Sequence, residues 1–220
     1  MRTAVIILAM LALLSTPVFS QTFVAGTVPH YSEFEVTENP NGYYWCGHAA
    51  LKAVGNYITG TTKSLNSLHK TFLANSPQGY GANDICLTNQ DWCARLSDLF
   101  WAAEYSKNNG YGRADSVIRI INRGTSPSLN YSGFYTQIKA GINANYPAII
   151  PSNWYYANAG HFFIVTGYKD MGDVQGSYLY LRDVAKGAPV YAKYDRVATV
   201  KAFFDSTKHS GNTIQILYVK

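Results

Sequence analysis

The chain changes character at Pro147, and this change constrains its fold more than any other feature. Before it, apolar residues recur at helical spacing, whereas after it β-branched and aromatic runs are separated by Gly, Asp and Pro turns. The runs are AIIPS, HFFIVTGY, SYLYLRDV, VYAKYDR and TIQILYVK, with one short helix expected around 199–205. Helices followed by an antiparallel sheet predict an α+β domain.

Several helices are expected ahead of this sheet. The first begins at Cys46 and stops at Gly60, because Ala50, Val54, Tyr57 and Ile58 share one face. Turn-forming residues make 21–45 an irregular segment. Further helices are expected over 64–73, from Thr88 to Asn109, around 115–122 and around 132–145.

The first twenty residues, MRTAVIILAMLALLSTPVFS, have the pattern of a secretory signal peptide. Arg2 precedes an apolar run over 4–14, and cleavage is expected after Ser20. The run is shorter than the ~18 residues that span a bilayer, so no stable membrane anchor is expected. We therefore expect a secreted or periplasmic protein in which residues 21–220 form a single domain.

Charge and histidine spacing narrow the range of partners. The formal net charge is +5, but the lysines and arginines are scattered without a basic block, so no nucleic-acid partner is expected. The histidines are scattered too, and no Cys/His spacing suggests tetrahedral ligation, so neither a metal nor another cofactor is expected. The sequence carries no signal for an oligomeric state.

The three cysteines are informative in an exported protein. Cys86 and Cys93 flank a short loop and can close a disulfide in an oxidising compartment. This pairing leaves Cys46 as the odd cysteine and a candidate reactive group. The alternatives are that Cys46 is a small buried hydrophobe or that a different pair forms.

The position of Cys46 favours a nucleophile. It begins a predicted helix, where backbone N–H groups and a partial positive charge stabilise a thiolate over a thiol. The same N–H groups can hold the oxyanion that forms when a thiolate attacks a carbonyl. Gly47 allows the substrate backbone to approach closely. A core cysteine at a helix start is the alternative.

A thiolate nucleophile usually works with a histidine that moves protons. His161 opens a strongly apolar strand directly after Asn-Ala-Gly and is the candidate base; a strand-end histidine with a structural role is the alternative. His48 lies two residues along the helix from Cys46 and is expected to point away from the thiol, in packing or on the surface. The remaining histidines are expected to be solvated: His30, His69 and His209.

Asp183 is the candidate that orients the imidazole. It ends the strand that follows His161 by one hairpin, and adjacent antiparallel strands can bring the two side chains within hydrogen-bonding distance. The alternative is a turn residue that terminates the strand.

These segments resemble, in order and character, the bacteriocin-processing-peptidase-like branch of the papain clan. They are NGYYWCGHAAL, YPAIIPSNWYYANAGHFFIVTGY and YLYLRDVAKG, and the resemblance runs from about residue 27 to about 190. It implies a papain-like fold in which the cysteine helix packs on the antiparallel sheet beside a cleft. It also implies a thiol hydrolase that cleaves a peptide or amide bond, with Cys46 as nucleophile, His161 as base and Asp183 as orienter; the signal peptide makes this an exported enzyme.

The sequence departs from this family at the oxyanion donor. Such enzymes usually carry a Gln a few residues before the cysteine, and no Gln lies between Gln21 and Cys46. Asn41 is the candidate substitute. Loss of one oxyanion donor costs about 10²–10³ in rate in well-studied enzymes.

Aromatic residues immediately precede both Cys46 and His161. Trp45, Trp154 and Tyr155 are expected to line the substrate groove, since aromatic side chains commonly line such pockets. Packing beneath the cleft is the alternative for each of them.

The same triad admits more than one function. The expected partner is a peptide or protein substrate, and an exported enzyme of this kind can also cut cell-wall peptide or transfer an acyl group to an amine. The third alternative is a catalytically inactive relative that binds peptides, which the missing Gln favours.

Overall fold

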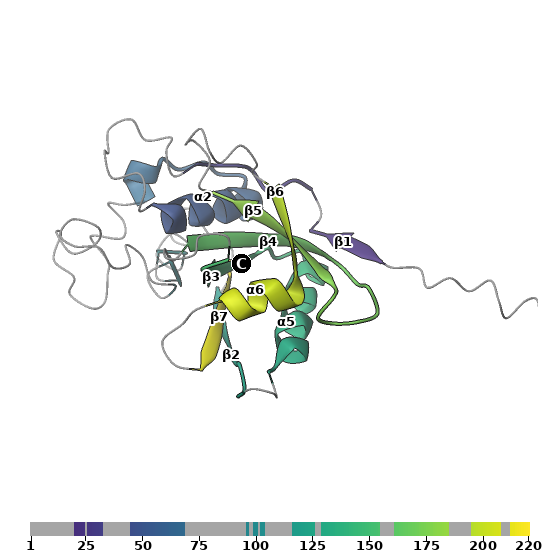
Figure 1. The fold of residues 1–220 in the computed structure, drawn as a ribbon. Coiled ribbons are helices and arrows are strands. Elements are labelled where there is room, and N and C mark those ends of the chain that lie inside the picture. Colours follow the sequence, from purple (N-terminus) through teal and green to yellow (C-terminus); the bar gives the residue numbers. More distant parts are fainter. Residues whose placement is uncertain are drawn as a thin grey trace, which may run out of the picture.

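A computed structural model of the chain is an α+β fold built on a seven-stranded antiparallel sheet (Figure 1). The described residues are 20–24, 26–32, 45–68, 96, 99–100, 102–103, 116–125, 129–154, 161–184, 195–207 and 212–220. The strands are β1 (Gln21–Phe23), β2 (Val117–Asn122), β3 (Ala148–Ser152), β4 (His161–Lys169), β5 (Tyr178–Asp183), β6 (Asp195–Thr199) and β7 (Thr213–Tyr218). The helices are α2 (Cys46–Thr59), α5 (Tyr131–Asn143) and α6 (Val200–Ser206).

The long strand β4 organises the sheet. The strand order is β2-β7-β3-β4-β5-β6, and β1 pairs with the far end of β4. Nearly every side chain of β4 is buried, as expected for a central strand that is covered on both faces. Figure 1 shows α2 on one side of the sheet and α5 and α6 on the other.

Strand β5 shows how the two faces differ. Leu179, Leu181 and Asp183 are buried, whereas the alternate residues are only half-buried, which is the period of two that a strand imposes. Beneath α5 and α6 lies a cluster of aromatic rings, with Phe163 of β4 5.8 Å from Phe203 of α6 between ring centroids. This cluster holds α6 against the part of β4 that begins with His161.

Helix α2 confirms the predicted start and stop. It begins at Cys46, and Gly60 ends it in a left-handed conformation with φ of 71°, donating its N–H to the Asn56 carbonyl. Ala49, Ala50 and Ala53 are fully buried. These short side chains let the backbone of α2 pack closely against β4, which it contacts.

Helix α5 is fixed at both its start and its middle. The Asn130 side chain accepts from the Gly133 N–H at 2.8 Å, which caps the helix. The Tyr218 hydroxyl of β7 donates to the Gln137 carbonyl at 2.8 Å. Burial raises the pKa of Tyr218, so its hydroxyl stays protonated as a donor. A Cβ atom placed on Gly141 would overlap the Tyr218 ring.

We expect Gly141→Ala to destabilise the protein even though alanine is the better helix former. Overpacking against a ring that is held by a hydrogen bond costs about 1–3 kcal/mol, which exceeds the gain in helix propensity of about 1 kcal/mol. Thr136→Ala, at an exposed position of the same helix, is the matched control and should be neutral or slightly stabilising. Urea denaturation of both variants measures the difference; a Gly141→Ala variant as stable as the control would contradict the packing argument.

The strands at 148–152, 161–168, 177–184 and 213–220 and the helices at 132–145 and 199–205 are confirmed to within a few residues. Two expectations are wrong. Residues 115–122 were expected to be helical, but Val117–Asn122 form β2, because β-branched residues there pair with β7. The segment 21–45, expected to be irregular, contains β1, which pairs with β4.

Three further elements are described only in part. The expected helix over 64–73 is described as helical at residues 65–68, and the one from 88 to 109 at residues 96, 99–100 and 102–103. The strand expected over 190–196 begins at Asp195 among the described residues and continues to Thr199.

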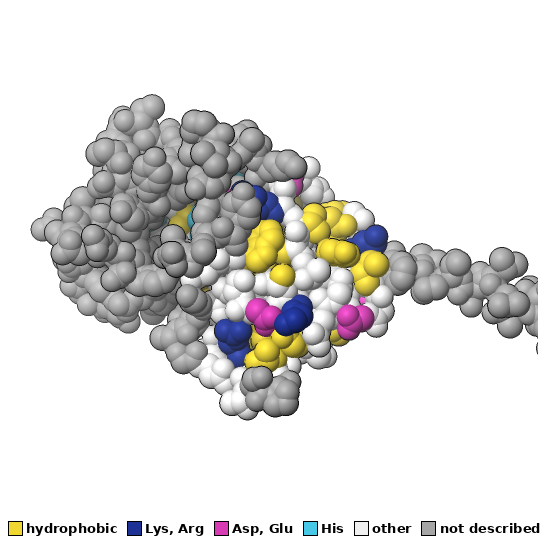
Figure 2. Space-filling model, viewed as in Figure 1, with side chains coloured by type: hydrophobic (Ala, Val, Ile, Leu, Met, Phe, Trp, Pro, Cys, Tyr) yellow, Lys and Arg dark blue, Asp and Glu magenta, His cyan; other side chains and the backbone are white. Residues whose placement is uncertain are grey.

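Exposed hydrophobic side chains occur at a few separate positions. Phe23, Ile120 and Val197 are 45%, 64% and 53% exposed. Figure 2 shows hydrophobic side chains beside β1 and basic side chains at several separate places on this face. Among the described residues, no helix has both the length and the apolar character that a bilayer crossing requires.

Candidate active site

His161 and Asp183 form a buried pair at one end of the sheet. His161 is the first residue of β4 and Asp183 the last of β5, and the register places Asp183 opposite Phe163. Because side chains two apart on a strand share a face, His161 and Asp183 are diagonal neighbours. The distance from His161 Nε2 to Asp183 Oδ1 is 2.9 Å, with side chains 7% and 2% exposed. The predicted proximity of the two side chains is therefore present.

The partner of each ring nitrogen follows from the chemistry of the carboxylate. An ionised carboxylate only accepts hydrogen bonds, so His161 Nε2 carries a proton and donates it to Asp183. In the neutral ring the other nitrogen, Nδ1, is then the acceptor. The pair thus leaves Nδ1 as the nitrogen that can take a proton from a nucleophile.

A third residue, which the sequence analysis did not identify, binds Asp183 of this pair. Arg196 of β6 donates from Nε to the second oxygen of Asp183, Oδ2, at 2.5 Å, and its side chain is only 10% exposed. Asp183 therefore lies between an imidazole and a guanidinium. The only signal in the sequence was the reversed order of Arg-Asp at 182–183 and Asp-Arg at 195–196, whose meaning depends on strand register.

The backbone of Asp183 is held from the N-terminal segment. His30 Nε2 lies 3.2 Å from the Asp183 carbonyl oxygen, which can only accept, so the ring donates. Next to it, Arg182 Nη1 donates to the Val28 carbonyl. His30, expected to be solvated, is half-buried and also binds the main chain of β5.

Cys46 lies at the start of the helix that packs on β4. The thiol is buried, and the N-cap residue Trp45 does not cap the helix with its side chain. The first turn of an α-helix has N–H groups that the helix itself does not use, and its dipole favours an anion there. Cys46 therefore lies where the helix start favours an anion, although its burial acts in the opposite direction.

Two of the aromatic candidates, Trp45 and Trp154, are described, and both pack against other rings. Trp45 is 2% exposed and stacks on His48, with ring centroids 5.0 Å apart. Trp154 packs edge-on against Phe163 and Phe203, at 5.7 and 6.2 Å. The burial of the Trp45 ring against His48 favours the packing alternative over the expected groove wall. Trp154 is half-buried and contacts these two rings, and its expected role in the groove stays a prediction.

The other candidates lie outside the described residues, so their expected roles stay predictions. They are Asn41 as oxyanion donor, Tyr155 in the groove, and the Cys86–Cys93 disulfide. Among the residues that are described, no group of three or more His, Cys, Asp or Glu side chains is arranged to hold a metal ion.

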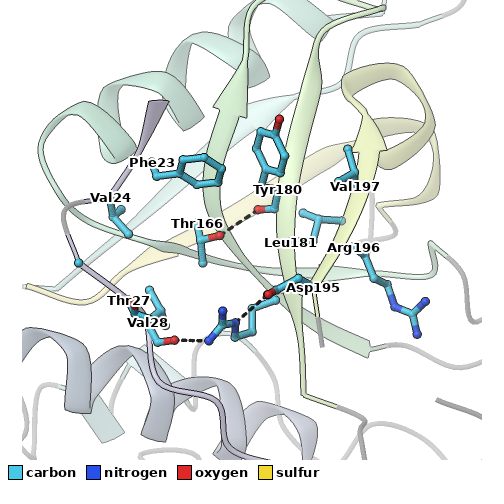
Figure 3. A pocket seen from close by; sticks show the side chains of 12 residues that line it. Phe23, Val24, Thr27, Val28, Thr166, Tyr180, Leu181, Asp195, Arg196 and Val197 are labelled. Atoms are coloured by element: carbon cyan, nitrogen blue, oxygen red, sulfur yellow. Dashed lines mark hydrogen bonds and ion pairs between the residues drawn. The ribbon is translucent and has the colours of Figure 1, made fainter. Parts of the chain in front are cut away.

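A pocket of about 470 Å³ lies on the face of β5 opposite to the Asp183 side chain (Figure 3). Phe23 fills the space over Gly167, and its ring lies 4.6 Å from that of Tyr180. Arg182 and Asp195, which both line the pocket, form an ion pair of 3.0 Å. Tyr180 and Arg182 face this pocket and Asp183 does not, because neighbouring strand residues point to opposite faces. The pocket is therefore separate from the His161–Asp183 pair.

A cysteine at a helix start, packed on an antiparallel sheet that carries a buried His–Asp pair, defines the papain-like class of fold. Residues 26–212 match the model of the Peptidase_C39 like family, and the chain belongs to this family of papain-clan cysteine peptidases. The resemblance stated from the sequence is thereby confirmed.

A solved structure supports the same fold. UfSP from C. elegans superposes with a TM-score of 0.56 at 10% identity, over 95% of this chain. The match covers 36% of the UfSP chain, so this protein spans about a third of that structure's length. Among curated proteins, no sequence matches the chain.

Proposed function

We propose that the chain hydrolyses a peptide or amide bond through Cys46, His161 and Asp183. The observation that carries this proposal is the buried His161–Asp183 pair, 2.9 Å apart, whose histidine lies on β4, the strand that the Cys46 helix contacts. Helix α2 supplies a nucleophile in an electrostatically favourable position, and β4 and β5 supply an oriented base.

The proposed reaction has two steps. The Cys46 thiolate attacks the carbonyl carbon, and the C–N bond breaks as His161 Nδ1 gives its proton to the leaving amine. A thioester remains on Cys46. His161 then takes a proton from a water whose oxygen attacks the thioester, which releases the acid and restores the thiolate. Asp183 keeps the ring oriented and offsets the charge of the imidazolium throughout.

The oxyanion of each tetrahedral intermediate needs hydrogen-bond donors. Backbone N–H groups in the first turn of α2 are suited to this task, and we propose Asn41 as the side-chain donor in place of the usual Gln. A single replaced donor lowers the rate without removing the nucleophile or the base. The departure is therefore compatible with a slower peptidase.

The substrate and the location of the protein are also proposals. We propose export by the N-terminal signal segment, with cleavage after about Ser20, and a peptide or protein substrate. Two enzymatic alternatives use the same triad: cleavage of cell-wall peptide and transfer of the acyl group to an amine. Cleavage of isolated muropeptides but not of casein would indicate the cell-wall alternative. Incorporation of a labelled amine into the acyl product would indicate transfer.

Alkylation of Cys46 tests whether the thiol is activated. We expect iodoacetamide to modify Cys46 in the folded protein at a pH well below ~8.5, the ordinary pKa of a thiol, because the helix start and an imidazolium stabilise the thiolate. Mass spectrometry of the Cys46 peptide gives the rate, and the urea-unfolded protein is the control. Labelling that rises at the same pH in both samples would refute the proposal.

A further inference from the structure

The Asp183 carboxylate has different partners on its two oxygens. Oδ1 accepts from His161 Nε2 at 2.9 Å and Oδ2 accepts from Arg196 Nε at 2.5 Å. These are charge-assisted hydrogen bonds, which are stronger and more directional than neutral ones. With both oxygens engaged, the carboxylate has little freedom to rotate, so the bond to Arg196 also fixes where Oδ1 lies relative to His161.

Strand register explains how Arg196 reaches the site. The β5–β6 pairing puts Arg196 opposite Leu181, and Leu181 shares its face of β5 with Asp183. Arg196 of β6 and Asp183 of β5 are thus diagonal neighbours. His161 has the same relation to Asp183 from β4, the other strand that pairs with β5. Figure 3 shows the Arg196 side chain pointing away from the pocket whose wall includes this residue.

A second Arg–Asp pair on the same two strands provides a comparison. Arg182 and Asp195 are directly opposite in the register and meet on the pocket face, at 3.0 Å. The Asp195 side chain is 70% exposed there, whereas those of Asp183 and Arg196 are 2% and 10% exposed. Water screens the first pair strongly and the second pair weakly. The two pairs have the same chemistry, but only the buried one contacts His161.

The charge of Arg196 also bears on the ionisation of Asp183. A guanidinium keeps its proton at all pH values of interest, and an adjacent positive charge favours the ionised form of a carboxyl group. Burial alone would favour the neutral form, which cannot offset the charge of an imidazolium. Arg196 thus supports both the orientation and the charge that His161 requires of its partner.

We propose that Arg196 is a positioning residue of the active site, which holds Asp183 ionised and directs its Oδ1 to His161. This inference rests on the proposed roles of Cys46, His161 and Asp183. Arg196 acts through Asp183 and takes no direct part in bond cleavage. It extends the Cys–His–Asp arrangement by one residue, contributed by a third strand.

The test compares Arg196→Gln and Arg196→Lys with the matched control Asp195→Asn. The Cys46 alkylation rate with iodoacetamide is measured across the acid and neutral range, and the melting temperature reports folding. In Arg196→Gln, Asp183 is protonated more readily and the thiolate–imidazolium pair loses support. Alkylation should therefore fail at a higher pH in Arg196→Gln than in the unmodified protein.

Arg196→Lys keeps the charge but loses the planar guanidinium geometry. We expect its acid limit to stay near that of the unmodified protein while peptide hydrolysis falls, by up to about 10²-fold if Asp183 is displaced by about 1 Å. Asp195→Asn should match the unmodified protein in both measurements. A purely structural role for Arg196 would lower the melting temperature without moving the acid limit.

Two results would overturn the inference. One is a folded Arg196→Gln variant whose acid limit equals that of Asp195→Asn. The other, decisive if Arg196→Gln does not fold, is an Arg196→Lys variant that hydrolyses peptide at the unmodified rate. Both are distinct from a failure of the proposed function, which appears in the unmodified protein as a Cys46 that alkylates like an ordinary thiol.

Discussion

We expect Cys46→Ala to lower the rate of peptide-bond hydrolysis by at least about 10⁴-fold, because removal of a nucleophile leaves only binding and oxyanion stabilisation. The fold should persist, since alanine fits wherever the slightly larger cysteine does and α2 gains a better helix former. The loss of one buried sulfur should cost about 1 kcal/mol or less in the free energy of unfolding. Activity and denaturation are measured on the same preparation.

Cys46→Ser is the control for shape. Serine keeps the size and hydrogen-bonding capacity of the side chain, but its hydroxyl does not ionise as a thiol does, so activity should be lost here too. A Cys46→Ala protein that still hydrolyses peptide would remove Cys46 from the role of nucleophile. If the unmodified protein cleaves neither casein nor muropeptides and Cys46→Ala keeps its biological effect, the chain is a peptide-binding relative.

The second large effect is expected from Asp183→Asn, which should reduce both activity and stability. Asparagine presents one acceptor and one donor group where the carboxylate offers two acceptors, so it cannot satisfy His161 and Arg196 together. The buried Arg196 guanidinium then lacks its anion, and breaking a buried ion pair in this way costs about 3–5 kcal/mol. Catalysis should fall by about 10⁴-fold, because the ring loses the acceptor that sets its tautomer.

Asp195→Asn is again the matched control for Asp183→Asn. It breaks an Arg–Asp pair of 3.0 Å between the same strands, but at a side chain that is 70% exposed. We expect it to cost less than about 1 kcal/mol, the upper range for exposed pairs, with no change in hydrolysis. Denaturation in urea and kcat for each variant make the comparison. Equal effects of the two substitutions would contradict the distinction between the buried and the exposed pair.

Local sequence patterns were sufficient for the elements that carry the candidate triad. The start of α2 at Cys46 and its end at Gly60 follow from apolar spacing and a glycine that adopts a positive φ without strain. The proximity of His161 and Asp183 follows from a single hairpin, whose two strands are neighbours in the chain. Both inferences use interactions within a helix or between consecutive strands.

Other features depended on segments that are distant in the sequence. Residues 117–122 form strand β2; their β-branched residues were a local signal for a strand, but the pairing with β7 depends on a segment almost a hundred residues away. Trp45 is buried because it packs beside His48. The presence of aromatic residues near Cys46 in the sequence did not tell whether they pack in the interior or line a groove. His30 came to the Asp183 carbonyl by a crossing of the N-terminal segment.

The sequence by itself thus determined the α+β class, the helix that begins at Cys46 and the His161–Asp183 hairpin, because periodicity and turn chemistry act over a few residues. Only the tertiary structure decided that Asp183 lies between His161 and Arg196, with Arg182–Asp195 on the opposite face. The physical reason is strand register. If β6 were shifted by one residue relative to β5, Asp195 and Arg196 would each point to the opposite face of the sheet.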